Sequence, residues 1–136
     1  MEPPSRFRSH PGAGCNRWRR TLRRLHEDTI SGAVPYCQFA IEYEIELLPV
    51  QYGQRFVDNC IRLLGGEILR CMSFATSHIE FDVGHTKFNA HFLGRMIAES
   101  PGRLDPLVKA GTAALDAFGE HLAECMMLAE SFGSRQ

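Results

Sequence analysis

Two histidines and one aspartate recur at a regular spacing in the segment SFATSHIEFDVGHTKFNAHF. His78, Asp82 and His85 form an HxxxDxxH pattern. An α-helix advances about 100° per residue, so Asp82 lies about 40° to one side of His78 and His85 about 20° to the other. The three side chains therefore share one helical face. Two imidazole nitrogens and a carboxylate oxygen that converge from one side are typical ligands of a divalent iron site with open positions.

The other residues on this face predict that it is buried. They are mostly apolar or aromatic: Cys71, Phe74, Phe81, Phe88, Asn89, Phe92 and Met96. A buried carboxylate or imidazole without a partner is strongly destabilising, so the polar side chains require compensation. The residues alone leave two explanations, a bound metal ion or a structural network in which Asp82 orients two histidines. Asn89 lies on this face, where it either packs or supports a metal ligand, with packing favoured. His91 lies on the opposite side of the helix, at the surface or in support of a ligand.

Length and composition predict one compact domain. The chain has 136 residues, of which 44% are hydrophobic and 23% charged, as in ordinary globular proteins. Residues 1–16 are rich in Pro, Gly, Ser and Arg without an apolar period, which predicts a flexible basic tail. Residues 17–136 are predicted to form a single helical-bundle domain. No segment alternates apolar and polar residues as hairpin strands do, so we predict an all-α fold built as an antiparallel bundle.

The elements that must position the motif are predicted as helices joined by short turns. A short amphipathic helix is expected over about residues 16–30, followed by one long helix or two over about residues 31–64. Pro49 should kink or break the second segment. Gly65 and Gly66 mark a stop, after which the helix carrying the motif is predicted from about residue 67 to 98.

The last helix is predicted to begin at the turn ESPGRLD and to run to about residue 131. Asp105 is a suitable N-cap and Pro106 suits the first helical position. Three methionines, Met96, Met126 and Met127, are expected to pack in the core.

Charge and cysteine content narrow the class of partner and compartment. The net charge of -1 gives no reason to expect nucleic acid as the main partner, and no apolar run is long enough to span a membrane. The five cysteines include no CxxC pair, which is typical of a reducing compartment. We therefore expect a cytoplasmic protein without disulfides, without membrane insertion and without nucleic-acid binding.

The segment EILRCMSFATSHIEFDVGHTKFNAHFLGRMI resembles the metal-bearing core helix of the haem-oxygenase-like di-metal oxidases. These belong to the superfamily of haem oxygenase, thiaminase and pyrroloquinoline-quinone synthase. Their helix supplies His, Asp and His at the HxxxDxxH spacing, which falls here on His78, Asp82 and His85. The downstream LDPLVKAGTAALDAFGEHL is similar to the helix that follows. The likeness covers roughly residues 31–131 by helix order, and the chain looks like a short or N-terminally truncated member.

The resemblance implies a shortened haem-oxygenase-like bundle with a non-haem Fe²⁺ cofactor, as one or two ions, or another divalent metal. It also implies oxidation of a small organic substrate by dioxygen. The remaining ligands in the family come from earlier helices, and the best match here is Glu42 in FAIEYEIELL. Glu46 lies one turn further along the same face, whereas Glu44 points elsewhere. His26 is the single histidine in the preceding helix and is not assigned as a ligand.

A shortened bundle would leave an apolar face exposed, so we expect a homodimer. Two alternatives to an iron oxidoreductase remain at this point. One is a non-catalytic interaction or assembly protein that keeps the polar stripe as a network. The other is a metal-free member of the same superfamily that transforms a small aromatic molecule in the same pocket.

Overall fold

The computed structural model describes residues 17–133, which are helical almost throughout and contain no strand. The all-α prediction is therefore confirmed, while the predicted tail over residues 1–16 lies outside the described residues. Among the described residues, no helix combines the length and the apolar character needed to cross a membrane. In chain order the elements are α1 Arg17–Ser31, η1 Pro35–Cys37, α2 Gln38–Leu64, η2 Gly66–Cys71, α3 Ser73–Glu99, η3 Pro101–Arg103 and α4 Leu104–Gly133.

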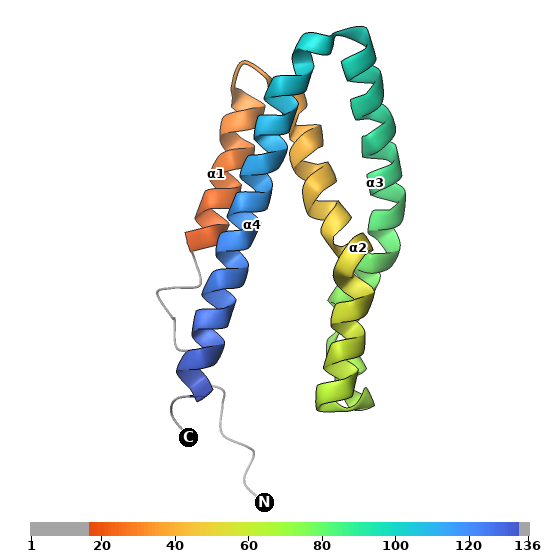
Figure 1. Ribbon diagram of the computed structural model, residues 1–136, viewed down its shortest axis with the longest axis vertical. Coiled ribbons are helices and arrows are strands. Elements are labelled where there is room, and N and C mark those ends of the chain that lie inside the picture. Colours follow the sequence, from red (N-terminus) through yellow and green to blue (C-terminus); the bar gives the residue numbers. More distant parts are fainter. Residues whose placement is uncertain (1–16, 134–136) are drawn as a thin grey trace, which may run out of the picture.

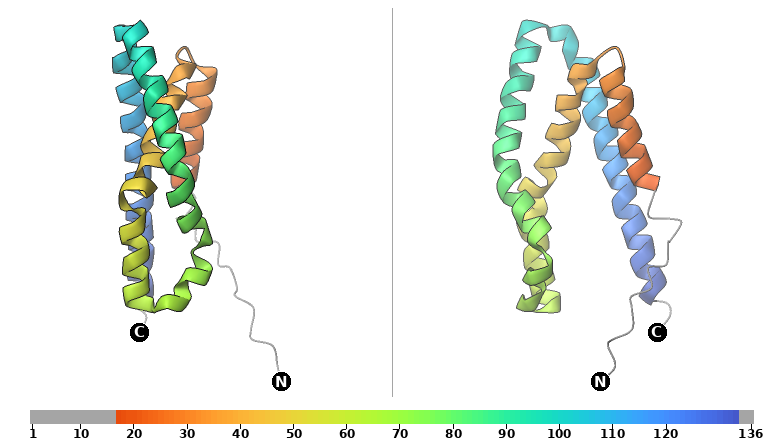
Figure 2. Two further views of the ribbon diagram at one scale, coloured as in Figure 1. Left: turned by 90° about the vertical axis from the view of Figure 1, so that its right-hand side faces the viewer. Right: turned by 180° about the vertical axis from the view of Figure 1, so that it is seen from behind.

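The four α-helices form two arms that meet at one end and diverge toward the other (Figure 1). One arm pairs α1 with α4, and the second pairs α2 with α3. Near the junction α2 also packs against α4, around a core of Cys37, Ala40 and Leu107. α3 and α4 follow each other in the chain but do not pack along their lengths, as the view from behind in Figure 2 also shows.

The connection from α2 to α3 differs from the prediction of a helix that starts near residue 67. Gly65 adopts a positive φ of 83° and ends α2, with its N–H donating to the carbonyl oxygen of Ile61. Residues Gly66–Cys71 then form the 3-10 helix η2, and α3 starts at Ser73. The prediction placed the start too early because helical pattern in the sequence does not distinguish a 3-10 turn from α-helix.

The start of α4 also differs from the prediction. Pro101–Arg103 form a 3-10 turn in which the Arg103 N–H donates to the carbonyl oxygen of Ser100, and α4 continues from Leu104. Asp105 and Pro106 therefore lie inside the first turn of α4, so the predicted N-cap role of Asp105 is wrong. Asp105 remains in the first turn, where its negative charge interacts favourably with the helix dipole.

α2 is one continuous helix of 27 residues with Pro49 in its interior, and it bends midway along its length (Figure 1). The predicted kink is thus present, and the predicted break is not. Gly53 lies one turn after Pro49, and a Cβ built on it would overlap the side chain of Ile79 on α3. The absence of a side chain at Gly53 therefore lets α3 approach α2 closely along the arm that carries the motif.

The predicted burial of the whole aromatic stripe on α3 is wrong. α3 buries Asp82, Thr86, Asn89 and Met96, whereas Phe74, Phe81 and Phe88 are 77%, 66% and 58% exposed. The phenylalanines lie about 100° round the helix from the seam that contacts α2, and no other helix of residues 17–133 covers that side. Met96 is buried as predicted, but Met126 and Met127 on α4 are exposed.

Candidate metal centre

The α2–α3 pair brings Glu46 together with Asp82 and His85. His85 Nδ1 lies 3.2 Å from Glu46 Oε1 and 3.6 Å from Asp82 Oδ1. One ligand atom from each of the three residues falls within 4.8 Å of the other two. Oxygen and imidazole nitrogen donors at such separations are able to hold one divalent cation between them. These three residues could hold a metal ion. Asp82 and His85 belong to the predicted HxxxDxxH set, and Glu46 is one of the two glutamate candidates on α2.

The two carboxylates of this group are largely withdrawn from water. The side chain of Asp82 is 5% exposed and that of Glu46 is 20% exposed, whereas the His85 ring is 61% exposed. Asn89, which is buried on α3, donates a hydrogen bond from Nδ2 to Glu46 Oε2 over 2.9 Å. The two carboxylates therefore lie at the buried side of the site, and the imidazole of His85 lies at the side that is open to solvent.

Burial raises the pKa of Glu46 above its ordinary value of 4.5. The nearby imidazole of His85 lowers this pKa, while the negative charges of Glu42 and Asp82 raise it. Carboxylates gathered in a partly desolvated space repel one another, and a bound cation relieves that repulsion. The electrostatics of Glu46 thus favour a positive charge at the centre of the group.

His78 lies beside the group without joining it. Its Nδ1 is 3.3 Å from Asp82 Oδ2, whereas His85 approaches the other oxygen, Oδ1. The ring is half exposed and lies 4.3 Å from the ring of Phe74. His78 and His85 therefore contact different oxygens of Asp82. In this arrangement His78 orients the carboxylate, in the manner of residues that support metal ligands through hydrogen bonds.

Glu42 faces a different set of partners, one turn before Glu46 on α2. Gln38 Nε2 donates to Glu42 Oε1 and also contacts His26 Nδ1, both over 2.6 Å. His26 Nδ1 lies 3.8 Å from Glu42 Oε1. Because an amide nitrogen donates, His26 Nδ1 accepts from Gln38, which thereby bridges His26 and Glu42. Glu44 points away from both sets and lies against Gly111 on α4.

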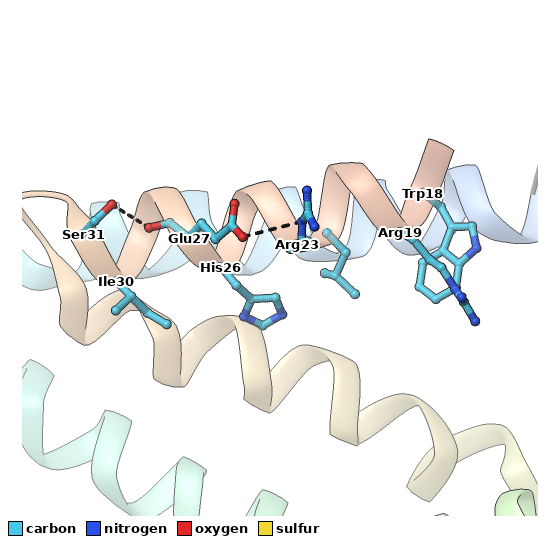
Figure 3. Close-up of a pocket in the computed structure, with 8 residues that line it drawn as sticks. Trp18, Arg19, Arg23, His26, Glu27, Ile30 and Ser31 are labelled. Atoms are coloured by element: carbon cyan, nitrogen blue, oxygen red, sulfur yellow. Dashed lines mark hydrogen bonds and ion pairs between the residues drawn. The ribbon is translucent and has the colours of Figure 1, made fainter. Parts of the chain in front are cut away.

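A groove of about 700 Å³ follows α1 and has His26 in its wall. Apolar atoms dominate its surface, and two arginines and one acidic residue add charge. Figure 3 shows His26 pointing from α1 toward α2, with Trp18 and Ile30 on the same side. Through His26 the groove adjoins Glu42, the carboxylate that precedes Glu46 on the same helix face. Its lining residues are Trp18, Arg19, Leu22, Arg23, His26, Glu27, Ile30 and Ser31.

The structure gives partners to His26 and Asn89. His26, which the sequence does not assign as a ligand, comes to Glu42 through the packing of α1 beside α2. Asn89 bonds Glu46 across 43 residues of sequence, which agrees with the supporting role left open for it. Gln38 was missed, although its spacing of four residues before Glu42 is a usable signal for a shared helix face.

His91, by contrast, is exposed, as its position on the opposite side of the helix predicted.

No protein-family model matches this chain, and neither the curated proteins nor the solved structures include a significant match to it.

Proposed function

We propose that this protein is a non-haem iron oxidoreductase that uses dioxygen to oxidise a small organic molecule. The observation that carries the proposal is the convergence of Glu46, Asp82 and His85, two largely buried carboxylates and one imidazole, on one point between α2 and α3. The HxxxDxxH resemblance to haem-oxygenase-like di-metal oxidases supports iron over other divalent metals. A ferrous ion held by two carboxylates and one imidazole supplies open coordination positions and the electrons with which dioxygen chemistry starts.

The donor set fits a divalent cation in charge and in protonation. Ionised Glu46 and Asp82 together balance a charge of about two. Burial, and to a smaller extent the charges of Glu42 and Asp82, raises the pKa of Glu46, and a bound cation would offset the repulsion between these carboxylates. To bind through Nδ1, His85 must carry its proton on Nε2. Most of the His85 ring is exposed, so water is available to accept a hydrogen bond from that proton.

Glu42 and His26 would hold a second ion, if two bind. The supporting observation is Gln38 Oε1, which is buried and has no hydrogen-bond partner among the described residues. A buried carbonyl oxygen without a donor, next to a carboxylate, favours a cation, and His26 Nδ1 would bind it in place of the hydrogen bond from Gln38. The resemblance to the di-metal oxidases likewise implies either one or two metal ions.

The groove along α1 is the proposed position of the organic substrate. Its apolar residues Trp18, Leu22 and Ile30 would exclude water from a hydrocarbon part of the substrate. Arg19 and Arg23 on the same wall would bind polar or anionic groups.

The unpaired thiols of the four cysteines among the described residues support a reducing, cytoplasmic location.

The decisive experiment is metal content after anaerobic reconstitution of the full chain with ferrous iron. We expect one or two irons per chain in the unmodified protein and in His91→Ala, the matched control on the exposed face of α3. His85→Ala should lose at least one iron per chain while keeping its helical circular dichroism. The same iron content in His85→Ala as in the unmodified protein would overturn the assignment of the site. Iron binding without oxygen consumption in a substrate screen would limit the proposal to metal binding.

A cofactor-free interaction protein is the second candidate, because exposed apolar side chains occur on α2, α3 and α4. In that case the polar group on α2 and α3 acts as a network only. Thermal unfolding separates the two. A ferrous ion at about 100 times its Kd stabilises the folded protein by about 2.7 kcal/mol, which a chelator reverses. A melting temperature that responds to neither iron nor chelator would favour the second candidate.

A further inference from the structure

We propose that a second copy of this chain packs on two exposed helical seams, one on α3 and one on α4, and thereby closes the open side of the metal centre. The term α3 seam is used for Phe74, His78, Phe81, His85, Phe88 and Phe92. The term α4 seam is used for Leu104, Val108, Leu115, Leu122 and Met126.

The α3 seam has the spacing of a coiled-coil stripe. Its members follow one another at alternating intervals of four and three residues, which keeps them on one side of a helix over several turns. Its first three phenylalanines are more than half exposed. The metal-site residue His85 and its neighbour His78 occupy the positions between these rings. Whatever covers the rings therefore also covers the open side of the metal centre.

The α4 seam shows the same kind of spacing, with intervals of four, seven, seven and four residues. Its side chains are between 39% and 65% exposed and all aliphatic or thioether. Gly119 lies on this face between Leu115 and Leu122, and no atom lies within 4 Å of a Cβ built on it. The α4 seam therefore offers a space into which a phenyl ring can insert as a knob enters a hole.

The combined apolar area of the two seams is sufficient for a dimer interface. From the exposed fractions, the apolar members of both seams present on the order of 1,000 Å² per chain. A stable dimer buries about 800 Å² per partner, so the seams suffice for one.

The geometry of the chain points to a second copy as the occupant. α3 and α4 are consecutive helices linked by the short η3 turn, and such neighbours normally pack together in a bundle. Here the two arms diverge, and α3 and α4 of residues 17–133 do not pack along their lengths (Figure 1). A two-fold dimer supplies this packing twice, because the α3 seam of each copy meets the α4 seam of the other.

The dimer follows from the seams and does not depend on the metal. The closure of the metal centre, however, rests on the proposed function of that site. The two claims fail separately, because association is measured on the metal-free full chain and iron is measured by stoichiometry. A dimer that binds no iron would uphold the interface and overturn the iron assignment, and an iron-binding monomer would do the reverse.

The first test is the mass of the metal-free protein by sedimentation equilibrium, beside Phe81→Glu and Ala90→Glu. Ala90 is exposed on the opposite side of α3 from Phe81, so it receives the same charge outside the seam. We expect twice the 15.3 kDa chain mass for the unmodified protein and for Ala90→Glu. Phe81→Glu should raise the dimer Kd at least about 30-fold, as for an interface hot spot. A monomeric unmodified protein at about 100 μM would overturn the proposal.

The second test decides which seams meet. Leu115→Lys on α4 should weaken the dimer as Phe81→Glu does, because each change alters both seam pairs of a symmetric dimer. Mixing the two variants should restore a dimer, since both changes then fall in one seam pair and the other pair is intact. Failure of the mixture to associate would overturn the α3–α4 pairing. Circular dichroism checks that both variants, altered at exposed positions, keep their helices.

Closure of the metal centre is tested separately, by the rate at which individual histidines are chemically modified. In the metal-free dimer, diethyl pyrocarbonate should modify His85 more slowly than in Leu115→Lys, whose substitution is on a different helix. His91, exposed and outside the seam, should react at the same rate in both proteins. Equal rates at His85 would show that the second copy leaves the centre open.

Discussion

Asn89 Nδ2 donates a hydrogen bond to Glu46 Oε2 over 2.9 Å and thereby connects α3 to α2 beside the candidate metal centre. Glu46 Oε1, the other oxygen of the same carboxylate, faces His85. One buried amide thus fixes the orientation of a carboxylate whose second oxygen is directed to the candidate metal centre. Residues that hold metal ligands in this way contribute to affinity without touching the metal.

Asn89→Ala should weaken metal binding by about 10–100-fold, because Glu46 loses the donor that orients it. Isothermal titration of the metal-free protein with Fe²⁺ or Mn²⁺ under anaerobic conditions measures this change. Asn59→Ala, at an exposed position on α2, serves as the control and should leave the affinity unchanged. Equal affinity in Asn89→Ala and the unmodified protein would show that the hydrogen bond does not support a ligand.

His78→Ala should also weaken metal binding by about 10–100-fold, while His85→Ala removes it. The reason is that His78 contacts Asp82 Oδ2, outside the three-residue group, whereas His85 Nδ1 lies close to both carboxylates. Measuring Kd for both variants under the same conditions checks the order. Complete loss of metal in His78→Ala would make His78 a direct ligand.

Glu46→Gln should raise the stability of the metal-free protein at neutral pH. Burial raises the pKa of Glu46 above 4.5, so the folded state binds this proton more tightly than the unfolded chain does. The contribution of Glu46 to the unfolding free energy is therefore largest below about pH 4.5 and is lost as the pH rises through the higher, folded pKa. Glutamine carries no titrating charge, so the Glu46→Gln variant is the more stable protein only at pH values above the folded-state pKa of Glu46.

Urea unfolding of both proteins in the presence of chelator, at about pH 4 and at about pH 7, checks this prediction. The neutral amide of the Glu46→Gln variant is not expected to bind a cation tightly, so the same substitution should abolish the stabilisation by iron. A variant that is less stable than the unmodified protein at neutral pH would show that the ion pair with His85 outweighs the burial of the carboxylate.

Gly53→Ala should destabilise the protein by about 1–3 kcal/mol, because the added methyl group overlaps Ile79 and pushes α3 away from α2. Replacement of Ile79 by Ala alone should also destabilise, through loss of packing. The double variant should be more stable than the sum of the two effects predicts, since the smaller side chain makes room for the methyl group. Additive effects in the urea unfolding free energies would show that the two residues do not compete for space.

The helical architecture could be predicted from particular residues. Trp18, Leu22 and Leu25 lie at i, i+4 and i+7, a spacing that predicts the helix expected over about residues 16–30, and the structure has α1 at Arg17–Ser31. Gly65 indicated the end of α2 because a positive φ suits glycine. Pro49 indicated a bend, and the continuity of α2 through it depends on neighbouring turns that a local pattern does not report.

Exposure of the aromatic stripe could not be predicted in the same way. Regular spacing reports that Phe74, Phe81 and Phe88 share a side of α3, but it does not report whether another helix lies there. Burial depends on the number of helices that surround α3, and among residues 17–133 α2 is the helix that packs along it. The side of α3 that carries Asp82 is buried because it faces α2. The side that carries the phenylalanines lies about 100° round the helix from it.

The sequence by itself determined that His78, Asp82 and His85 share one face of a helix in an all-α protein, because helix periodicity is a local property. Only the tertiary structure decided which of these groups meet Glu46, that His78 lies outside that group, and that His26 reaches Glu42. Those outcomes depend on how far the helices approach and at what rotation, which is set by contacts such as Gly53 with Ile79 between residues distant in the chain.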